Sequence, residues 1–423
     1  MKYIISIVFI TALLPGVGPN LNFGFFFLSP FRLALVLLPI IWFLKKLLLK
    51  EELIYCIKKK NMISVLFYVF WFIYSVITIF WVKSISAWSH EEYFLGVGLL
   101  CILLFDMSEL TIKNFEFVLK GVWIALVIHN LLGWYEVLTQ NYLFAAPERV
   151  ALMSQNNDYY PVTTMLNQND LILVLVFGAC LFIYFMVSSK TWKIKILNGG
   201  LLLSDIGLAI ATDSRAGLLS LVIGILILGM FMLSKRVKIG ILLVAIILGM
   251  GVVFVKPDII VHISSSLREM EMISFENATV NSDAVRMNLI RNGLVFLKET
   301  FGFGVGTGNA DYWMQTEPVY YVRGFTNMHN WWVEILTNYG ILLFVLYILF
   351  YCYLFYSLYR KYKESENMQR KRMCLLFMAF MGAFLVGSIS SSSNWGKEWL
   401  WVLWALIIAF QGEEENSEKR LLN

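Results

Sequence analysis

Charged residues are scarce in this sequence. Only 15% of its 423 residues are charged, whereas 59% are hydrophobic. A soluble domain is about a quarter charged and near half apolar, so this composition excludes an ordinary soluble protein. Apolar runs of about twenty residues recur along the chain, long enough to cross a bilayer as helices. No alternating strand pattern indicates a barrel, so we predict an all-α polytopic membrane protein.

The motifs of nucleotide and metal chemistry are also missing. The sequence has no P-loop and no H-E-x-x-H, and no predicted outer loop has the D-x-D spacing that holds a catalytic metal. The run GFGVGTG at 302–308 resembles a dinucleotide fingerprint, but no strand precedes it and no βαβ unit surrounds it. We therefore predict no cofactor and no metal, and expect these glycines to allow a sharp turn or the close approach of a ligand.

The apolar runs predict about twelve spans within a single membrane domain over residues 1–423. The first begins at Met1 without a cleavage site, so we expect a retained helix. The predicted spans are 3–14, 31–49, 63–82, 93–105, 115–138, 170–188, 194–212, 216–233, 238–255, 331–358, 373–392 and 398–411.

Lysine and arginine gather in loops that lie an even number of predicted spans apart. These basic loops are 45–60, 190–195, 234–238 and 360–372. Such sorting indicates topology, and it places these loops and both termini in the cytoplasm. The long loop at 256–330 then faces outward. The few cysteines fall within spans or on the cytoplasmic side, so no disulfide framework is expected.

Arg215 is the first outward-facing candidate, in the run ATDSRAGLL. Thr212, Asp213 and Ser214 are good N-cap residues, so Arg215 begins a helix. A helix N-terminus with an arginine fork suits a phosphate group. The alternative is an arginine that reaches the membrane interface and pairs with Asp213.

The long loop contains a second pair of candidates. Its apolar pattern predicts a helix over 284–298, lying on or near the outer surface and followed by the glycine-rich turn. Arg286 and Arg291 lie on this helix about 140° apart, so at most one faces a common pocket. The alternative is that both are solvated.

His329 and Asn330 precede two tryptophans and an apolar span. A histidine there can act as a general base, since its ordinary pKa lies near working pH. The alternative is an interfacial histidine beside a tryptophan belt. Several further polar residues are predicted inside the membrane, as structural pairs or a proton relay: His129, Glu136, Asp205 and Glu334.

The order of these features is more specific than any one of them. An outward SRAG at 214–217 opens a span, and an arginine-bearing helix leads into GFGVGTGN at 302–309. HNWWVEILTNYGILL at 329–343 then enters the next span. This order resembles the O-antigen ligase and polysaccharide polymerase (Wzy-type) family of bacterial membrane proteins, chiefly over 205–345. PVTTMLNQND at 161–170 is similar to the Asn-Asp entry to a span in that family.

The resemblance implies a GT-C-like glycosyltransferase in the bacterial cytoplasmic (inner) membrane, with its active site on the extracytoplasmic face. The implied donor is an undecaprenyl-pyrophosphate-linked oligosaccharide, transferred to a glycan acceptor without metal or nucleotide sugar. Expected partners are the lipid bilayer, a chain-length regulator and a flippase, and no nucleic acid. The implied catalytic residues are His329, Arg286 and Arg215, and the implied substrate-binding residues are Asn330, Arg291, Gly304, Gly306, Asn169 and Asp170.

We favour a polymerase that joins repeat units of an O-antigen, capsule or exopolysaccharide. The chain is rich in Lys, Ile, Asn and Phe, which is typical of an AT-rich genome. Many bacteria with such genomes have capsules and lack lipid A. One alternative is a ligase that transfers finished glycan to lipid A core or another acceptor. A flippase, or a structural assembly factor without chemistry, is an alternative of another class.

Overall fold

The computed structural model describes residues 1–18, 21–22, 27–50, 57–156, 159–232, 282–391 and 393–414. Apart from one ladder of two short strands, the regular structure of this part is helical, which confirms the predicted all-α class. The span predicted at 238–255 and the first part of the long loop, 256–281, lie outside the described residues.

The elements follow the apolar runs of the sequence. In chain order they are α1 (Lys2–Leu13), β1 (Leu21–Asn22), β2 (Phe27–Leu28), α2 (Pro30–Leu48), α3 (Met62–Ile77), η1 (Thr78–Phe80), α4 (Ile85–Met107), α5 (Ile112–Thr139), α6 (Pro147–Asn156), η2 (Thr163–Met165), α7 (Gln168–Ser188), α8 (Trp192–Ala211), α9 (Arg215–Met232), α12 (Ser282–Glu299), α13 (Asn309–Thr316), α14 (Trp331–Glu364), α15 (Met368–Gly387) and α16 (Glu398–Gln411).

Six helical segments of the described part are long and apolar enough to cross a membrane. They are Met62–Phe80, Ile112–Thr139, Gln168–Ser188, Trp192–Ala211, Arg215–Met232 and Trp331–Glu364. The helices α1 and α16 are apolar but shorter. The chain is therefore an integral membrane protein, whereas the number of about twelve spans stays a prediction.

Two predicted spans lie on helices whose ends differ from the predicted boundaries. The span predicted at 93–105 is part of the longer α4, because the Ser84 hydroxyl caps the Ala87 amide at 3.2 Å and starts the helix in a polar segment. The span predicted at 373–392 lies on α15, which begins at Met368, capped by Asn367, and ends at Gly387 before a serine run. Hydrophobicity alone did not predict these helix ends, because capping side chains determine where a helix begins.

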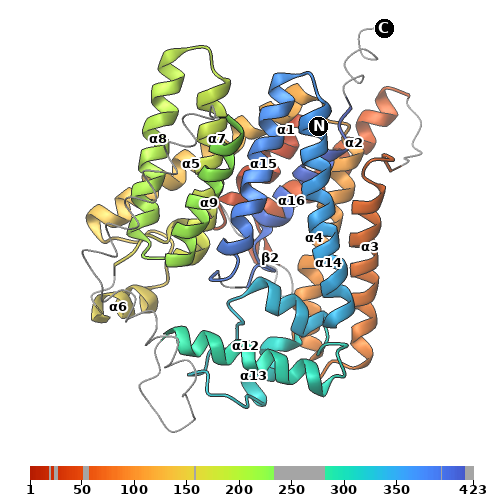
Figure 1. Ribbon diagram of the computed structural model, residues 1–423, viewed down its shortest axis with the longest axis vertical. Helices are drawn as coiled ribbons and strands as arrows, with labels where there is room; N and C mark the ends of the chain where they lie inside the picture. The colour runs from red at the N-terminus through yellow and green to blue at the C-terminus, as the bar shows by residue number, and fades with distance from the viewer. Residues whose placement is uncertain are drawn as a thin grey trace.

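The helices form a bundle whose centre is built from α7, α15 and α16, with α8 and α9 on one side and α2 and α3 on the other (Figure 1). Almost every residue of α7 and α16 is buried. Peripheral helices instead expose large apolar side chains, such as Leu48 on α2 and Leu203 on α8. An apolar surface of this kind suits contact with lipid.

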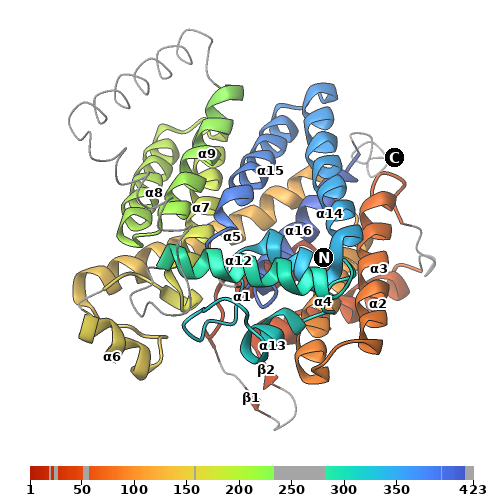
Figure 2. The same cartoon turned by 60° about the horizontal axis from the view of Figure 1, so that its bottom comes forward.

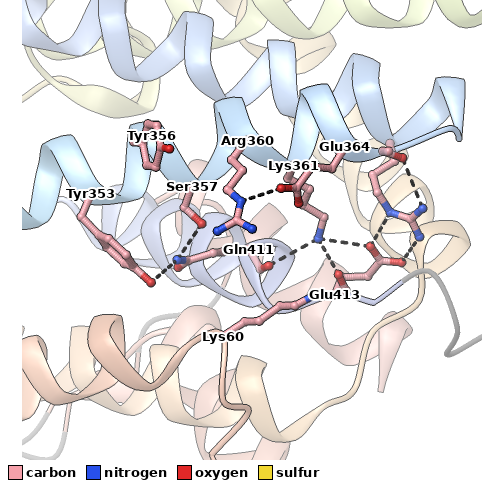
Figure 3. Close-up of a pocket in the computed structure, with 11 residues that line it drawn as sticks. Lys60, Tyr353, Tyr356, Ser357, Arg360, Lys361, Glu364, Gln411 and Glu413 are labelled. Carbon is pink, nitrogen blue, oxygen red and sulfur yellow. Dashed lines mark hydrogen bonds and ion pairs between the residues drawn. The ribbon is translucent and has the colours of Figure 1, made fainter.

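One end of the bundle, which we call the basic end, is closed by buried ion pairs. Arg370 donates two hydrogen bonds to the Glu413 carboxylate, at 2.7 and 2.6 Å, and Lys361 lies 3.2 Å from the same group. Figure 3 shows Lys361 and Glu413 at a cavity of about 320 Å³ at the ends of α14 and α16, which Arg370 also lines. Glu413 thus joins α14, α15 and the segment after α16.

The opposite end, which we call the loop end, carries the predicted helix of the long loop. The helix α12 confirms the prediction for 284–298, and it lies across the ends of the bundle helices in both views (Figures 1 and 2). Beneath it a separate apolar core packs α12 against α13 and the loop that follows, with Leu289, Phe296 and Met314 at its centre. This core fixes α12 over the bundle.

Candidate functional site

Two asparagines set the rotation of α12 about its own axis. The Asn292 amide oxygen accepts hydrogen bonds from the backbone of Val319 and Tyr320 at 2.9 and 2.8 Å, and its nitrogen donates to the Tyr320 carbonyl at 2.8 Å. Asn288 donates to the Tyr321 carbonyl at 2.9 Å. One face of α12 is thereby tied to the segment 319–321, which fixes the directions of the remaining side chains.

The two arginines of α12 consequently have different surroundings. The Arg291 guanidinium lies 5.8 Å from the centre of the Tyr320 ring. Arg286 is half-buried and lies near enough to His329 for its charge to act on that ring. No hydrogen bond or ion pair joins the Arg286 guanidinium to a residue of the described ranges. Of the two arginines, Arg286 is therefore placed to meet a ligand beside the histidine.

His329 is held in a strained turn at the start of α14. Its φ is +47°, and its backbone N–H donates to the Asn327 side chain at 2.9 Å. A positive φ in a residue other than glycine is costly and is often found at functional sites. The ring donates to the backbone of Ser391, whereas Nδ1 is buried and has no hydrogen-bond partner in the described structure. In the neutral ring, Nδ1 then carries the free lone pair.

Charged groups around His329 favour the neutral ring. Burial lowers the pKa of His329, and the positive charge of Arg286 lowers it further. Asp170 acts in the opposite direction, and Lys397 adds a smaller lowering. A neutral imidazole with an unoccupied nitrogen is the form that can accept a proton.

A charged pair next to the histidine was missed by the sequence analysis. Lys397, directly before α16, lies 3.0 Å from the Asp170 carboxylate at the start of α7 and donates to Asn394 at 2.8 Å. Only 7% and 10% of the two side chains are exposed. The sequence feature that could have indicated this pair is a lone lysine in the short predicted outer loop 393–397. Asp170 itself was predicted as a substrate-binding residue.

Asn169 joins the helix of Asp170 to that of Arg215. The Ser214 hydroxyl donates to the Asn169 amide oxygen at 2.8 Å, which places the starts of α7 and α9 side by side. Arg215 is exposed as the first residue of α9. The predicted residues Asn169, Asp170 and Arg215 thus lie in one region of the loop end.

Asn330 and Glu334 serve the start of α14. The Asn330 side chain caps the helix by accepting from the backbone of Trp332 and Val333, at 3.1 and 3.3 Å. The buried Glu334 accepts a hydrogen bond of 2.6 Å from Ser393. The cap explains Asn330 structurally, and its predicted contact with substrate stays a prediction.

A hollow of about 540 Å³ opens beside the Asp170–Lys397 pair. Its wall includes both charged residues, Ser393, and the aromatic rings of Phe144 and Trp399. The end of α1 and the turn η2 complete the wall. A hollow of this size with mixed polar and aromatic walls is large enough for a small sugar unit.

Buried polar residues of the bundle hold that wall in place. His129 hydrogen-bonds to Thr163 and to the Leu13 carbonyl, at 2.9 and 2.8 Å, so it links the end of α1 to η2. Glu136 accepts from the backbone N–H groups of Val162 and Thr163. Asp205 accepts from Asn130 at 2.6 Å. These hydrogen bonds fit structural pairs, and a proton relay, the other alternative that the sequence left open, stays untested by them.

The glycine-rich turn packs against a break in α14. Helix α14 has a non-helical residue at Gly340, and the amides of Val305 and Gly306 donate to the Thr337 and Asn338 carbonyls at 2.9 Å each. A Cβ at Gly304 would lie 2.5 Å from the Gly340 nitrogen. Close contact within the protein therefore accounts for Gly304 and Gly306, and their predicted role in substrate binding stays a prediction.

This fold and these side chains define a class: a polytopic helical membrane protein that gathers an arginine, an unoccupied imidazole nitrogen and a buried lysine–aspartate pair at one end. Residues 200–348 match the family model described as O-Antigen ligase. The chain is also 28% identical over 348 residues to the "Teichuronic acid biosynthesis protein TuaE" of Bacillus subtilis (strain 168), covering 81% of this chain and 70% of that protein. Both similarities support the resemblance to the O-antigen ligase family.

Proposed function

We propose that this protein is a GT-C-like glycosyltransferase that polymerises polysaccharide repeat units. The donor is a glycan linked to undecaprenyl pyrophosphate, and the loop end faces the outside of the cytoplasmic membrane. One observation carries the proposal: the unpartnered Nδ1 of His329 lies beside the charges of Arg286, Asp170 and Lys397 and near a hollow of about 540 Å³.

The chemistry of glycosyl transfer matches these groups. The acceptor hydroxyl must lose a proton as it attacks the anomeric carbon, and Nδ1 of His329 accepts that proton. The bond from the anomeric carbon to the pyrophosphate breaks, and the departing oxygen takes the electron pair. Arg286 and Arg215 stabilise this negative charge, as fixed cations do in a partly dry site.

The placement of the site supports a lipid-linked donor. The loop end lies at the ends of the apolar helices, where a polyprenyl chain can stay in the bilayer while its pyrophosphate reaches the cations. The described parts of the basic loops, 45–50, 57–60, 190–195 and 360–372, lie at the opposite end (Figure 1), and such loops are usually cytoplasmic. The similarity to a protein named for teichuronic acid biosynthesis favours synthesis of a polymer.

A ligase is the second candidate, because the matching family model is described as O-Antigen ligase. A ligase uses the same donor and leaving group but transfers one finished glycan to another acceptor. The same residues would serve both reactions, so the product distinguishes a ligase from a polymerase.

The purified protein in lipid nanodiscs, incubated with a lipid-pyrophosphate repeat unit, tests the proposal. A ladder of longer lipid-linked products is expected from a polymerase. A single transfer to an added acceptor would instead identify a ligase. If neither product forms while the glycan crosses the bilayer of sealed vesicles, the protein is a flippase. If His329, Arg286 and Arg215 can all be changed to alanine without loss of polysaccharide, the protein has a structural role and is neither a polymerase nor a ligase.

A further inference from the structure

A structural role alone explains the buried ion pair between Lys397 and Asp170 poorly. Both side chains are at least nine-tenths buried, and the Lys397 Nζ atom lies 3.0 Å from the carboxylate. Removing two charges from water costs several kcal/mol each, so a buried pair is often no more stabilising than apolar residues of similar size. Here the pair also lines an open hollow rather than a closed core.

The pair borders both the hollow and the histidine. Lys397 and Asp170 are part of the hollow's wall, and both charges act on the His329 ring. Asn394 orients the ammonium group by accepting from it at 2.8 Å. A ligand that fills the hollow and extends toward His329 therefore meets Lys397 on its way.

We propose that Lys397 is a further substrate-binding residue, which exchanges Asp170 for the pyrophosphate of the lipid-linked donor when the donor's first sugar enters the hollow. This inference rests on the proposed function. Asp170, released from the ammonium group, accepts a hydrogen bond from a hydroxyl group of that sugar. Lys397 keeps its proton throughout, while the acceptor's proton goes to His329 and the electron pair of the broken bond stays on the pyrophosphate.

A lysine is suited to exchanging the Asp170 carboxylate for a pyrophosphate. A lysine ammonium is a compact charge on a flexible stem and binds phosphate without the fixed geometry of a guanidinium. Asp170 is a suitable temporary partner, because it keeps the buried ammonium charged and in place before the donor arrives. The half-buried Phe144 and Ser393 in the same wall offer the aromatic ring and hydroxyl that a sugar unit can contact.

Binding of undecaprenyl pyrophosphate, measured on the full chain in nanodiscs, tests the inference separately from catalysis. We expect Lys397→Gln to weaken binding at least about tenfold and to raise the KM for the donor more than it lowers kcat. Lys397→Arg keeps the charge and should recover most of the affinity. His329→Ala should bind the carrier normally and transfer sugar about 10²–10⁴-fold more slowly. Lys83→Gln is the matched control, because Lys83 pairs with Glu317 in an exposed ion pair, outside the site.

Each outcome decides between the two proposals. If the wild type neither binds the carrier nor transfers sugar, the proposed function fails. If the wild type does both and folded Lys397→Gln binds equally well, only the role of Lys397 is overturned. Should Lys397→Gln not fold, the double variant Lys397→Gln/Asp170→Asn removes both charges and has the same expected loss. Labelling of the wild type with a photoreactive undecaprenyl pyrophosphate gives an independent measurement: a crosslink within 393–399 supports the inference, and labelling elsewhere alone contradicts it.

Discussion

At the scale of single residues, His329 combines a strained backbone with an unused ring nitrogen. Its φ of +47° is maintained by the Asn327 side chain, and its ring is oriented by the backbone of Ser391. Neither contact uses Nδ1, which is buried without a partner in the described structure. An arrangement that costs strain and leaves a polar atom unsatisfied is expected where the atom has a chemical role.

We expect His329→Ala to lower the rate of glycan transfer by about 10²–10⁴-fold, the usual contribution of a general base. The amount of protein in the membrane should stay at the wild-type level, because the ring makes one hydrogen bond to the protein. Transfer assays on equal amounts of purified protein check this. Full activity in the variant would refute the assignment of the base.

The pH dependence of transfer should report the same ring. A base must be neutral, so activity rises with pH through the pKa of His329 and is constant above it. Burial and Arg286 both lower this pKa, which places the rising limb below the usual range of histidine. Arg286→Gln removes one lowering charge and should move the limb to higher pH.

Transfer rates are measured over about pH 5 to 8 and divided by the plateau rate of each variant. The midpoint of the resulting pH profile does not depend on any loss in donor binding. Lys83→Gln, which changes a cation that does not act on the His329 ring, should leave the midpoint where it is. A midpoint that stays fixed or falls in Arg286→Gln would show that this arginine does not act on the titrating group.

At the scale of elements, the break in α14 depends on the glycine-rich turn. A helix interrupted among apolar neighbours exposes carbonyl groups that need donors. The turn supplies them through Val305 and Gly306, and Tyr74 of α3 donates to the Phe303 carbonyl at 3.1 Å. The turn thereby connects α12 to α3 and to α14, the helix that begins two residues after His329.

We expect Gly304→Ala to lower the midpoint of thermal unfolding and to reduce transfer. Its φ of +83° strains an alanine by about 1–3 kcal/mol, and the added Cβ would lie 2.6 Å from the Asn338 carbonyl oxygen. Gly324→Ala is the matched control: its φ is +77°, but no atom lies within 4 Å of the new Cβ. Differential scanning fluorimetry should show the smaller decrease in the control, and equal decreases would exclude the steric contact as the cause.

At the scale of the whole molecule, the two ends of the bundle have different roles. At the basic end, Arg370 and Lys361 share the nearly inaccessible Glu413, so each cation has an anionic partner within the protein. At the loop end, Arg286 is without a described ion-pair partner, and the Lys397–Asp170 pair faces a hollow. We infer that the first set of charges stabilises the bundle and that the second binds ligand.

Glu413→Gln should therefore destabilise the protein without changing the chemistry. Loss of one partner leaves two buried cations with less compensation, and breaking such a pair costs about 3–5 kcal/mol. We expect a lower midpoint of thermal unfolding, with wild-type transfer per folded molecule below that temperature. Glu364→Gln is the control, since the Glu364–Arg360 pair is largely exposed. A normal midpoint of thermal unfolding together with reduced transfer in Glu413→Gln would show that the charges of the basic end serve the chemistry rather than stability.

The sequence by itself determined the class of fold and most of the helices. Long apolar runs with few charges can be satisfied in a bilayer only by helices, and this requirement is local to each run. The helix of the long loop followed from the spacing of its apolar residues, and the turn after it followed from the glycines. The helix ends at Ser84 and Asn367 were harder to predict, because one capping side chain decides each of them.

Only the tertiary structure decided which side chains meet. The choice of Arg286 over Arg291 depends on Asn288 and Asn292, which bind a segment about thirty residues further along the chain and so set the rotation of α12. The Lys397–Asp170 pair joins helices far apart in the sequence, and no local pattern encodes such a contact. Periodicity fixes which face of a helix is apolar, whereas the packing of distant helices fixes which charges share one site.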